Sequence, residues 1–333
     1  MNSRTEVVRE KVQGSREGRV RAAFYHGGDL THENPAYLRA FQGIADELLR
    51  QDAEAGDLTV EAMGIGSRKC AVEIRAKEAG VVAGIAEAAW LYGRAGAALE
   101  KPVNDGEFLK AGDVLLRVES DAATLLSLER AAVNLLQRIS GIATATRKLV
   151  ELARNASSTA HVIATRKTLW GLLDKRAVHW GAAGTHRLNL GDAALIKTNH
   201  LRLASNGGAM DLESAIERAR RNRRDAKFFE VEAATPEEAV KVAGVLGKLQ
   251  AQDFNCPCVL MLDNFSSANA AGTVAALRDA GLHDDVLVEA SGNISETSIA
   301  AYAASGVDAI SVGALTHSAR ALDLSARLIP IPR

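Results

Sequence analysis

The sequence of 333 residues is long enough for two domains, or for a barrel and one smaller domain. Hydrophobic residues make up 47% of it, charged residues 24%, and the formal net charge is -1, so the basic excess of a nucleic-acid-binding protein is absent. No apolar run reaches membrane-spanning length, and the charged amino terminus lacks the apolar core of a signal peptide. We therefore expect a cytoplasmic protein with neither nucleic acid nor a membrane as its partner.

The three cysteines, Cys70, Cys256 and Cys258, are too few for a disulfide framework. Cys256 and Cys258 lack the spacing of a zinc ribbon, and no second pair follows them. We interpret all three as ordinary, partly buried thiols rather than as redox or metal-binding groups.

The first residues, 1–35, are charged and have weak periodicity, so they are expected to form a peripheral N-terminal extension. Apolar residues at helical spacing then predict a helix over 35–50. The stretch 68–120 follows with alternating apolar and polar positions and turn signals, which is typical of a small β-rich unit. An α/β sandwich domain is accordingly expected over 36–125.

Within this domain, Asp105-Gly106 is a hairpin signal. The surrounding sequence, VNDGEFLKAGDVLLRVE, resembles half of a biotinyl or lipoyl carrier domain, but no lysine stands at a hairpin tip. We therefore favour a small sandwich that packs against a helix.

A long helical stretch with an apolar stripe follows at 127–153, where Ser140 and Gly141 are expected to kink or end the helix. The barrel domain is predicted over 126–320. The tail, 321–333, contains prolines and is expected to pack as an extended segment.

Six apolar runs of strand length occupy the barrel region, and each leads into polar or glycine residues. The segments that follow them are TRKT at 165–168, KTNH at 197–200, EVE at 230–232, DN at 263–264, EASGN at 289–293 and GALTH at 313–317. Most of the intervening sequence can hold a helix, so the pattern predicts an α/β fold with an open barrel of parallel strands. The chemistry of such a barrel lies at the carboxyl ends of its strands.

Cations and hydrogen-bond donors are concentrated near these strand ends, namely Arg166, Lys167, His186, Arg187 and Lys197. They indicate a polyanionic substrate, because arginine forks match carboxylates and phosphates. The acids, Glu230 or Glu232 together with Asp263, suit ribose hydroxyls or a Mg²⁺ ion that keeps several waters. The segments Ser291–Asn293 and Gly313-Ala314 suit a phosphate held by backbone amides. Together these groups describe phosphoribosyl transfer to a small acid.

Each group also has an ordinary structural explanation. A single cation after a strand is usually a surface charge, and a single acid at a strand end is more often a helix cap. His317 is weighed equally as a helix-start histidine and as a functional one. The arginine-rich stretch 218–227 is interpreted as a solvated helix face rather than a nucleic-acid patch.

Several motifs occur in order between Gly56 and Ser318. They are GDLT at 56–59, KEAGVVAG at 77–84, ERAAVNLLQRISGIAT at 129–144, TRKT at 165–168, THRLNLGDAALIKTNH at 185–200, EVE at 230–232, LDNF at 262–265, EASGNI at 289–294 and GVDAISVGALTHS at 306–318. As an ordered set they resemble the nicotinate-nucleotide pyrophosphorylase family, also called quinolinate phosphoribosyltransferase. The resemblance implies that quinolinate and phosphoribosyl pyrophosphate are converted, with Mg²⁺, to nicotinate mononucleotide, pyrophosphate and carbon dioxide in NAD biosynthesis. It also implies a homodimer with a shared active site, or an oligomer of such dimers.

The resemblance further implies roles for individual residues. Those implied to be catalytic are Lys167, Lys197, Glu232 and Asp263, of which the two acids would face the ribose and hold Mg²⁺, directly or through water. Those implied to bind the quinolinate carboxylates are Arg166, His186 and Arg187, with Lys167 and Lys197 facing a carboxylate and the pyrophosphate. Those implied to cradle the 5-phosphate are Ser291, Gly292, Gly313 and Ala314. Thr165 and Asn293 complete the expected substrate-binding set, and Arg130 would enter the active site of the neighbouring subunit.

Some features depart from the family pattern. TRKTLWGLLDKRAV replaces the usual TRKTTPGLR, Thr198 stands where the family has aspartate, and the triplet before the His-Arg pair is Gly181-Ala182-Ala183. One alternative is therefore a paralogous phosphoribosyltransferase that acts on another pyridine or azole acid. A second alternative is a non-catalytic barrel that binds a phospho-sugar, which the retention of Glu232, Asp263 and the lysines argues against.

Overall fold

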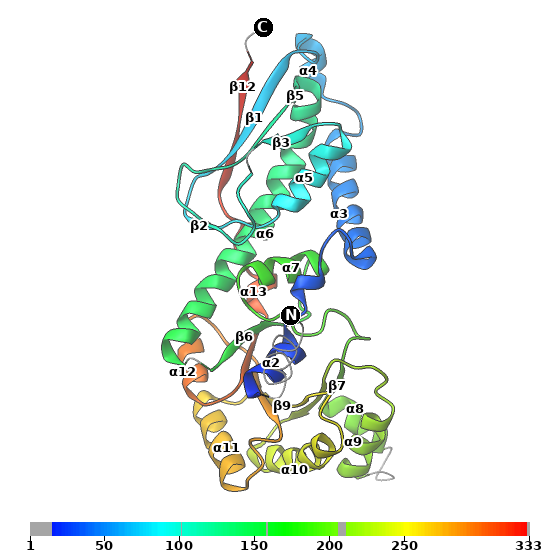
Figure 1. The fold of residues 1–333 in the computed structure, drawn as a ribbon, viewed down its shortest axis with the longest axis vertical. Helices are drawn as coiled ribbons and strands as arrows, with labels where there is room; N and C mark the ends of the chain where they lie inside the picture. Colours follow the sequence, from blue (N-terminus) through cyan, green and yellow to red (C-terminus); the bar gives the residue numbers. More distant parts are fainter. Residues whose placement is uncertain (1–14, 101, 158, 206–210, 332–333) are drawn as a thin grey trace, which may run out of the picture. The chain divides into compact units, whose positions relative to one another are not determined.

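The computed structural model describes residues 15–331 apart from 101, 158 and 206–210 (Figure 1). The fold is α/β, with one sheet of six parallel strands and a separate antiparallel sheet. The chain forms two compact units, each discontinuous in sequence. The first unit comprises Met1–His26, Leu149–Lys167 and Ala183–Ala314, and the second comprises Gly27–Lys148, Thr168–Ala182 and Leu315–Arg333. Among the described residues, no helix is long and apolar enough to cross a lipid bilayer.

The parallel sheet of the first unit confirms the six predicted strands. They are β6 (His161–Ala164), β7 (Ala194–Ile196), β8 (Phe229–Ala233), β9 (Cys258–Asp263), β10 (Leu287–Ser291) and β11 (Ala309–Val312). Their order in the sheet is β6-β11-β10-β9-β8-β7, so β6 and β7 are the two edges. Because all the strands are parallel, their carboxyl ends lie at one side of the sheet. The strand β8 is longer than predicted and contains Glu230 and Glu232, which were expected after its end.

Helices follow most of these strands. They are α8 (Thr198–Ser205), α9 (Leu212–Arg221), α10 (Pro236–Gln252), α11 (Ser267–Asp279) and α12 (Ile299–Ala304). Consecutive helices contact one another, and α10 packs on β8 and β9. The interpretation of 218–227 as a solvated face is wrong for Arg220, which is buried and donates to the carbonyl oxygens of Cys256 at 2.9 Å and Asp253 at 3.1 Å.

The helix α2 (Arg16–Phe24) belongs to the first unit and begins at Ser15, whose side chain accepts a hydrogen bond from the amide of Gly18. Val20, Ala23 and Phe24 are buried in a hydrophobic cluster with residues of the parallel sheet. The expectation that 1–35 is peripheral is therefore wrong for this helix. The few apolar residues of α2 give no clear helical pattern in the sequence, because charged residues lie between them. Residues 1–14 lie outside the described part of the chain.

The sheet of the second unit has the order β12-β1-β5-β3 and is antiparallel (Figure 1). Its strands are β12 (Leu324–Pro330), β1 (Lys69–Ala76), β5 (Val114–Asp121) and β3 (Ala98–Glu100), and the short strands β2 (Gly80–Val81) and β4 (Phe108–Leu109) form a separate pair. The predicted tail is thus extended, as expected. Asp105-Gly106 forms a turn but no hairpin, because β3 and β4, on either side of it, pair with different strands.

The helical elements that lie wholly or mostly in the second unit are η1 (Gly27–Asp29), α3 (Pro35–Ala53), α4 (Leu58–Met63), α5 (Ile85–Arg94), α6 (Ala122–Ala156), α7 (Leu172–Trp180) and α13 (Ala314–His317). The helix predicted over 35–50 is confirmed by α3, which Asn34 caps. The predicted break at Ser140 and Gly141 is wrong, because α6 is continuous. Ser140 Oγ instead accepts from the amide of Ala83 at 3.0 Å, and a Cβ at Gly141 would lie 2.1 Å from the carbonyl oxygen of Arg320. These two residues serve close packing.

Candidate active site

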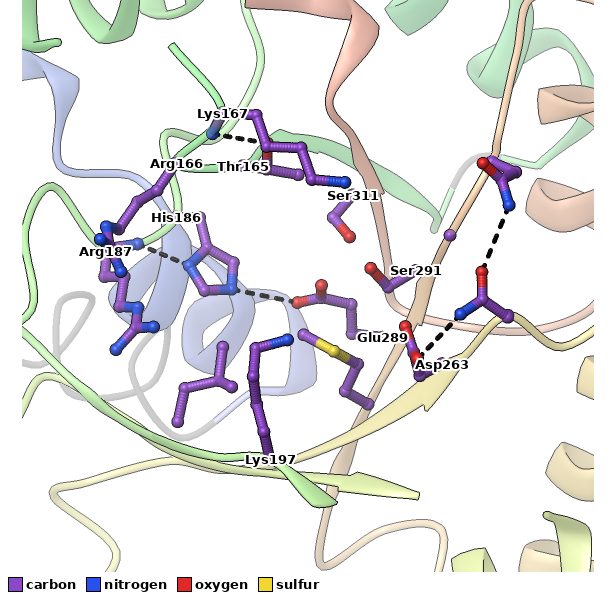
Figure 2. Close-up of a pocket in the computed structure, with 15 residues that line it drawn as sticks. Thr165, Arg166, Lys167, His186, Arg187, Lys197, Asp263, Glu289, Ser291 and Ser311 are labelled. Carbon is purple, nitrogen blue, oxygen red and sulfur yellow. Dashed lines mark hydrogen bonds and ion pairs between the residues drawn. The ribbon is translucent and has the colours of Figure 1, made fainter. Parts of the chain in front are cut away.

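A cavity of about 350 Å³ opens at the carboxyl ends of the parallel strands (Figure 2). Its lining brings together most of the residues that the sequence predicted. The lining residues are Thr165, Arg166, Lys167, His186, Arg187, Leu195, Lys197, Met261, Asp263, Asn264, Glu289, Ser291, Gly292, Asn293 and Ser311. All of them belong to the first unit.

One side of the cavity is cationic. Arg166 and Lys167 follow β6, and the hydroxyl oxygen of Thr165 accepts the amide of Lys167 at 3.1 Å. Arg187 is 9% exposed, and its guanidinium donates to the carbonyl oxygen of Ala193 at 3.2 Å. Burial, and after it the positive charge of Arg166, lowers the pKa of Arg187. A bound anion would relieve this repulsion between neighbouring guanidiniums.

His186 is held at both ring nitrogens by the protein itself (Figure 2). The amide of Arg187 donates to Nδ1 at 2.7 Å. On the other side, Nε2 lies 3.2 Å from a carboxylate oxygen of Glu230 and 3.4 Å from one of Glu289. Both glutamates have no exposed surface. The ring is therefore engaged by the protein at both of the atoms that could bind a substrate carboxylate.

The buried cluster of His186, Glu230 and Glu289 shares protons. Burial and the neighbouring Glu289 raise the pKa of Glu230 to about 7. Burial would also raise the pKa of Glu289, but the charge of His186 and the hydrogen bonds to this carboxyl together outweigh burial and lower the pKa. Burial alone would lower the pKa of His186, but the two carboxylates outweigh it and raise the pKa to about 9. The amide that points at Nδ1 opposes a second ring proton, so this geometry favours an Nε2–H tautomer with the other proton on the glutamate pair.

Among the described residues, His186, Glu230 and Glu289 form the one group of three histidine, cysteine or acidic side chains whose ligand atoms lie close enough together to share a metal ion. Proton sharing accounts for the close approach of these three side chains without a bound ion. Glu289 lines the cavity and was not predicted as a site residue. The signal that could have found it is an acid inside an otherwise apolar strand run, Val286-Leu287-Val288-Glu289-Ala290.

Lys197 and Glu232 form an ion pair at the end of β7. Nζ of Lys197 lies 2.9 Å from Oε2 of Glu232, and the amide and hydroxyl of Thr198 donate to Oε1 at 3.2 and 3.0 Å. Burial would raise the pKa of Glu232, but the hydrogen bonds from Lys197 and Thr198 outweigh it and lower the pKa. Glu232 does not line the cavity itself, and acts on it through Lys197.

Asp263 lines the cavity as Glu289 does, but unlike Glu289 it is only half-buried. Burial, followed by the negative charge of Glu232, raises its pKa. The side-chain amide of Asn264 donates to Oδ2 of Asp263 at 2.8 Å. Asp263 and Glu232 thus differ in function, because Asp263 lines the cavity whereas Glu232 is paired with Lys197.

The opposite wall is built from two loops in unusual backbone conformations. Asn264 has φ 58°, Gly292 has φ 104° and Asn293 has φ 50°. The amide of Asn264 donates to the carbonyl oxygen of Ser291 at 2.8 Å, and a Cβ at Gly292 would lie 2.3 Å from Oδ1 of Asn264. Such strained positions gather at ligand sites. This wall requires glycine at 292.

Four predicted residues lie outside the cavity lining. Besides Glu232, these are Gly313 and Ala314, which follow β11, and Arg130, on α6 in the second unit. The Arg130 side chain is 57% exposed and lies 3.7 Å from Glu129. It borders a small pocket with Asp52 and Asn134. The roles of these residues stay predictions. His317 is exposed, and its Nδ1 contacts the hydroxyl of Ser318 at 2.6 Å.

Comparisons with known proteins identify relatives that match most of the chain. The sequence model of the quinolinate phosphoribosyl transferase C-terminal domain matches residues 142–327, and that of the N-terminal domain matches 57–140. A probable nicotinate-nucleotide pyrophosphorylase (carboxylating) from Methanothermobacter thermautotrophicus is 36% identical over 284 residues, covering 85% of this chain and 96% of the relative. One from Archaeoglobus fulgidus is 37% identical over 277 residues, covering 82% and 98%. The crystal structure of NadC from Streptococcus pyogenes is similar with a TM-score of 0.75 at 30% identity, covering 86% of this chain and 96% of that one.

Proposed function

The chain belongs to the quinolinate phosphoribosyl transferase family, and we propose from this premise that it converts quinolinate and phosphoribosyl pyrophosphate to nicotinate mononucleotide, pyrophosphate and carbon dioxide in NAD biosynthesis. The observation that carries the proposal is a single cavity in which Arg166, Arg187 and Lys197 face Asp263 and the loop Ser291–Asn293. A dicarboxylate and a phosphorylated sugar together carry the charges that such a lining complements.

We propose that Arg166 and Arg187 bind the quinolinate carboxylates. The mutual repulsion of the two guanidiniums and the partial burial of Arg187 support this assignment. His186 was expected to bind a carboxylate as well, but its two ring nitrogens contact the protein. We propose instead that His186 orients Arg187 through the hydrogen bond at Nδ1.

The proposed chemistry follows from the charges on the two sides of the cavity. The pyridine nitrogen of quinolinate attacks the anomeric carbon of the ribose as pyrophosphate leaves. Lys167 and Lys197 stabilise the negative charge that gathers on the leaving group. The ring becomes a pyridinium, whose positive charge stabilises the electron pair left on the ring carbon when the adjacent carboxylate departs as carbon dioxide. That carbon then takes up a proton, supplied in the end by solvent. A site closed to water favours that step. Ser291 and Gly292 bind the 5-phosphate of the ribose, with Gly313 and Ala314 beside them.

We propose Mg²⁺ as the cofactor. Asp263 offers a cavity-facing carboxylate, whereas Glu232 is committed to Lys197 and Thr198 and fits a contact through water. This donor set suits an ion that keeps several waters and takes further oxygens from the substrate phosphates. When bound, Mg²⁺ would neutralise pyrophosphate as it leaves.

We also propose a homodimer in which Arg130 completes the active site of the neighbouring subunit. Its side chain stays 57% exposed although it lies 3.7 Å from Glu129 of the same chain, so the guanidinium is accessible to a neighbouring subunit. The cytoplasm is the proposed compartment. The three cysteines are all buried and free, as a reducing compartment would leave them.

The test is release of pyrophosphate from phosphoribosyl pyrophosphate with quinolinate, compared with nicotinate and an azole dicarboxylic acid. We expect turnover with quinolinate alone, with an equal amount of carbon dioxide formed. Turnover with another acid in preference to quinolinate would identify a paralogous phosphoribosyltransferase. Binding of the phosphorylated sugar without any turnover would identify a non-catalytic barrel.

A further inference from the structure

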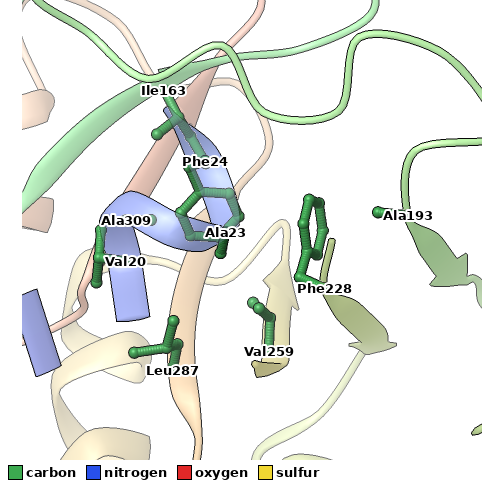
Figure 3. Packing of buried hydrophobic residues seen from close by; sticks show 9 residues of the cluster. All are labelled: Val20, Ala23, Phe24, Ile163, Ala193, Phe228, Val259, Leu287 and Ala309. Atoms are coloured by element: carbon green, nitrogen blue, oxygen red, sulfur yellow. The ribbon is translucent and has the colours of Figure 1, made fainter. Parts of the chain in front are cut away.

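The helix α2 packs into the hydrophobic core of the first unit (Figure 3). Its residues Val20, Ala23 and Phe24 lie against the strand residues Val259 and Leu287. They contribute to the same buried cluster as Ile163, Phe228, Ala193 and Ala309. The segment Ser15–His26 lies outside both family matches, which begin at residue 57.

The amino-terminal end of α2 is anchored at the start of two strands. The guanidinium of Arg16 contacts the carboxylate of Asp308, with one N···O distance of 2.6 Å. The same carboxylate accepts the amide of Val288 at 2.7 Å, which ties the anchor to β10. The next residue, Glu17, lies 2.6 Å from Nε2 of His161, the first residue of β6. The helix is thus fixed to the sheet at the end opposite the cavity.

The carboxyl-terminal end of α2 holds the segment that carries the site histidine. The carbonyl oxygen of Phe24 accepts the amides of Thr185 at 2.7 Å and His186 at 3.0 Å. The amide of His26 donates to the hydroxyl oxygen of Thr185 at 3.1 Å. His186 has φ 54°, a conformation that non-glycine residues rarely adopt, so it persists only where surrounding contacts impose it.

The Phe24 side chain acts on the same residue. Its ring stacks on the imidazole of His186 with a centroid distance of 5.4 Å and an interplanar angle of 27°. Phe228 packs edge-on against both rings, with centroid distances of 5.2 Å to Phe24 and 5.1 Å to His186. Phe24 of α2 therefore covers one face of the His186 ring, while Arg187 and the two glutamates contact the ring nitrogens.

We propose that Phe24 is a positioning residue for the substrate acid: it fixes the ring and backbone of His186 and, through the hydrogen bond at Nδ1, the position of Arg187. The identity of the acid rests on the proposed function, whereas the placement of His186 does not. Phe24 is fully buried and does not line the cavity, so its effect on the substrate is transmitted through His186.

The test compares Phe24→Ala with Phe24→Leu and with Val20→Ala, which opens space in the same cluster without contacting His186. We expect Phe24→Ala to raise KM for quinolinate about tenfold or more, since small displacements of binding groups have effects of this size, and to leave KM for phosphoribosyl pyrophosphate nearly unchanged. Phe24→Leu should recover part of the loss. Val20→Ala should lower Tm and leave both KM values unchanged. If Phe24→Ala and Val20→Ala both lower Tm and have the same KM for quinolinate, α2 only fills the core and the proposal is wrong.

A second measurement does not depend on the substrate. The ¹⁵N resonances of the His186 ring, assigned by their loss in His186→Asn, report its tautomer and hydrogen bonds in the free protein. We expect them to shift in Phe24→Leu, which retains most of the buried volume, and to stay in place in Val20→Ala. Unchanged resonances would overturn the proposal even if Phe24→Ala failed to fold. Shifted resonances in a protein that does not use quinolinate would support the positioning role and reject the proposed function.

Discussion

Glu232 accepts a hydrogen bond from Nζ of Lys197 at 2.9 Å, and its other oxygen accepts both donors of Thr198. The carboxylate thus fixes a lysine at the edge of the cavity and the first residue of α8 in one arrangement. Thr198 is a neutral donor that contacts the carboxylate of Glu232 directly. An aspartate would place a second negative charge beside Glu232.

The first prediction separates the charge of Lys197 from the hydrogen bond of Thr198. We expect Lys197→Met to lower kcat about a hundredfold, because the leaving pyrophosphate loses a cation at the moment it gains charge. Thr198→Val keeps the shape and removes one of three donors to Glu232, so its loss should stay below about tenfold. Steady-state kinetics at saturating substrates measure both. Equal losses would mean that Lys197 serves only to hold Glu232.

The second prediction concerns Arg166, which lines the cavity next to Arg187. We expect Arg166→Ala to lose roughly 2–5 kcal/mol of quinolinate binding, because a charge-assisted contact to a carboxylate disappears. Binding of phosphoribosyl pyrophosphate should suffer less. Calorimetry measures both, with Arg221→Ala on the exposed face of α9 as the control. Unchanged quinolinate affinity would remove Arg166 from this role.

The third prediction concerns stability and pH. Burial and Glu289 raise the pKa of Glu230 from its ordinary 4.5 to about 7. The folded protein then keeps a proton that the unfolded chain releases, so the stabilisation is complete below pH 4.5 and is lost as the pH rises through 7.

We therefore expect the free energy of unfolding, measured by urea titration, to fall between pH 4.5 and 7 in the parent and to fall less in Glu230→Gln. The exposed Glu61, exchanged for Gln in the same way, is the control. A parallel pH dependence in Glu230→Gln and the parent would show that this carboxyl does not hold the proton.

The fourth prediction concerns Gly292, where φ is 104° and a Cβ would strike Asn264. We expect Gly292→Ala to cost roughly 1–3 kcal/mol of stability and to raise KM for phosphoribosyl pyrophosphate, because the wall of the cavity must shift. Gly281 also has a positive φ but has open space around its Cβ position. Gly281→Ala should therefore lower Tm slightly and leave KM unchanged. The same kinetic result for both variants would contradict a phosphate-binding role of this wall.

The fifth prediction tests the shared active site. Arg130→Ala and Lys167→Ala proteins should each be nearly inactive. If two subunits build each site, mixed dimers contain one site with both defects and one with neither, so activity should partly return on mixing. Exchange of subunits is followed by native mass spectrometry. Demonstrated exchange without returning activity would place the action of Arg130 within its own chain.

The strands and most of the cavity could be predicted from the sequence because central parallel strands are buried on both faces and read as continuous apolar runs. The polar residues directly after such runs then fall at one side of the sheet. That rule identified Arg166, Lys197 and Asp263 as neighbours although they are far apart in the chain.

The rule failed where polar residues belong to the strand itself. Glu230 and Glu289 lie inside β8 and β10, and only the fold shows that His186 contacts both carboxylates and makes their burial possible. It also missed α2, because Arg16 and its charged neighbours made the segment look solvated. The partner of Arg16, Asp308, lies near the opposite end of the sequence and cannot be recognised from local pattern.

The pairing of β1 with β12 has a consequence for how the protein is made. Residues Lys69–Ala76 are translated long before their neighbours Leu324–Pro330. Until those residues leave the ribosome, β1 presents an unpaired edge, which is where nascent chains associate wrongly. Folding of this sheet can finish only after Leu324–Pro330 have been made. A premature stop codon before residue 324 would thus damage a sheet whose first strand was translated long before.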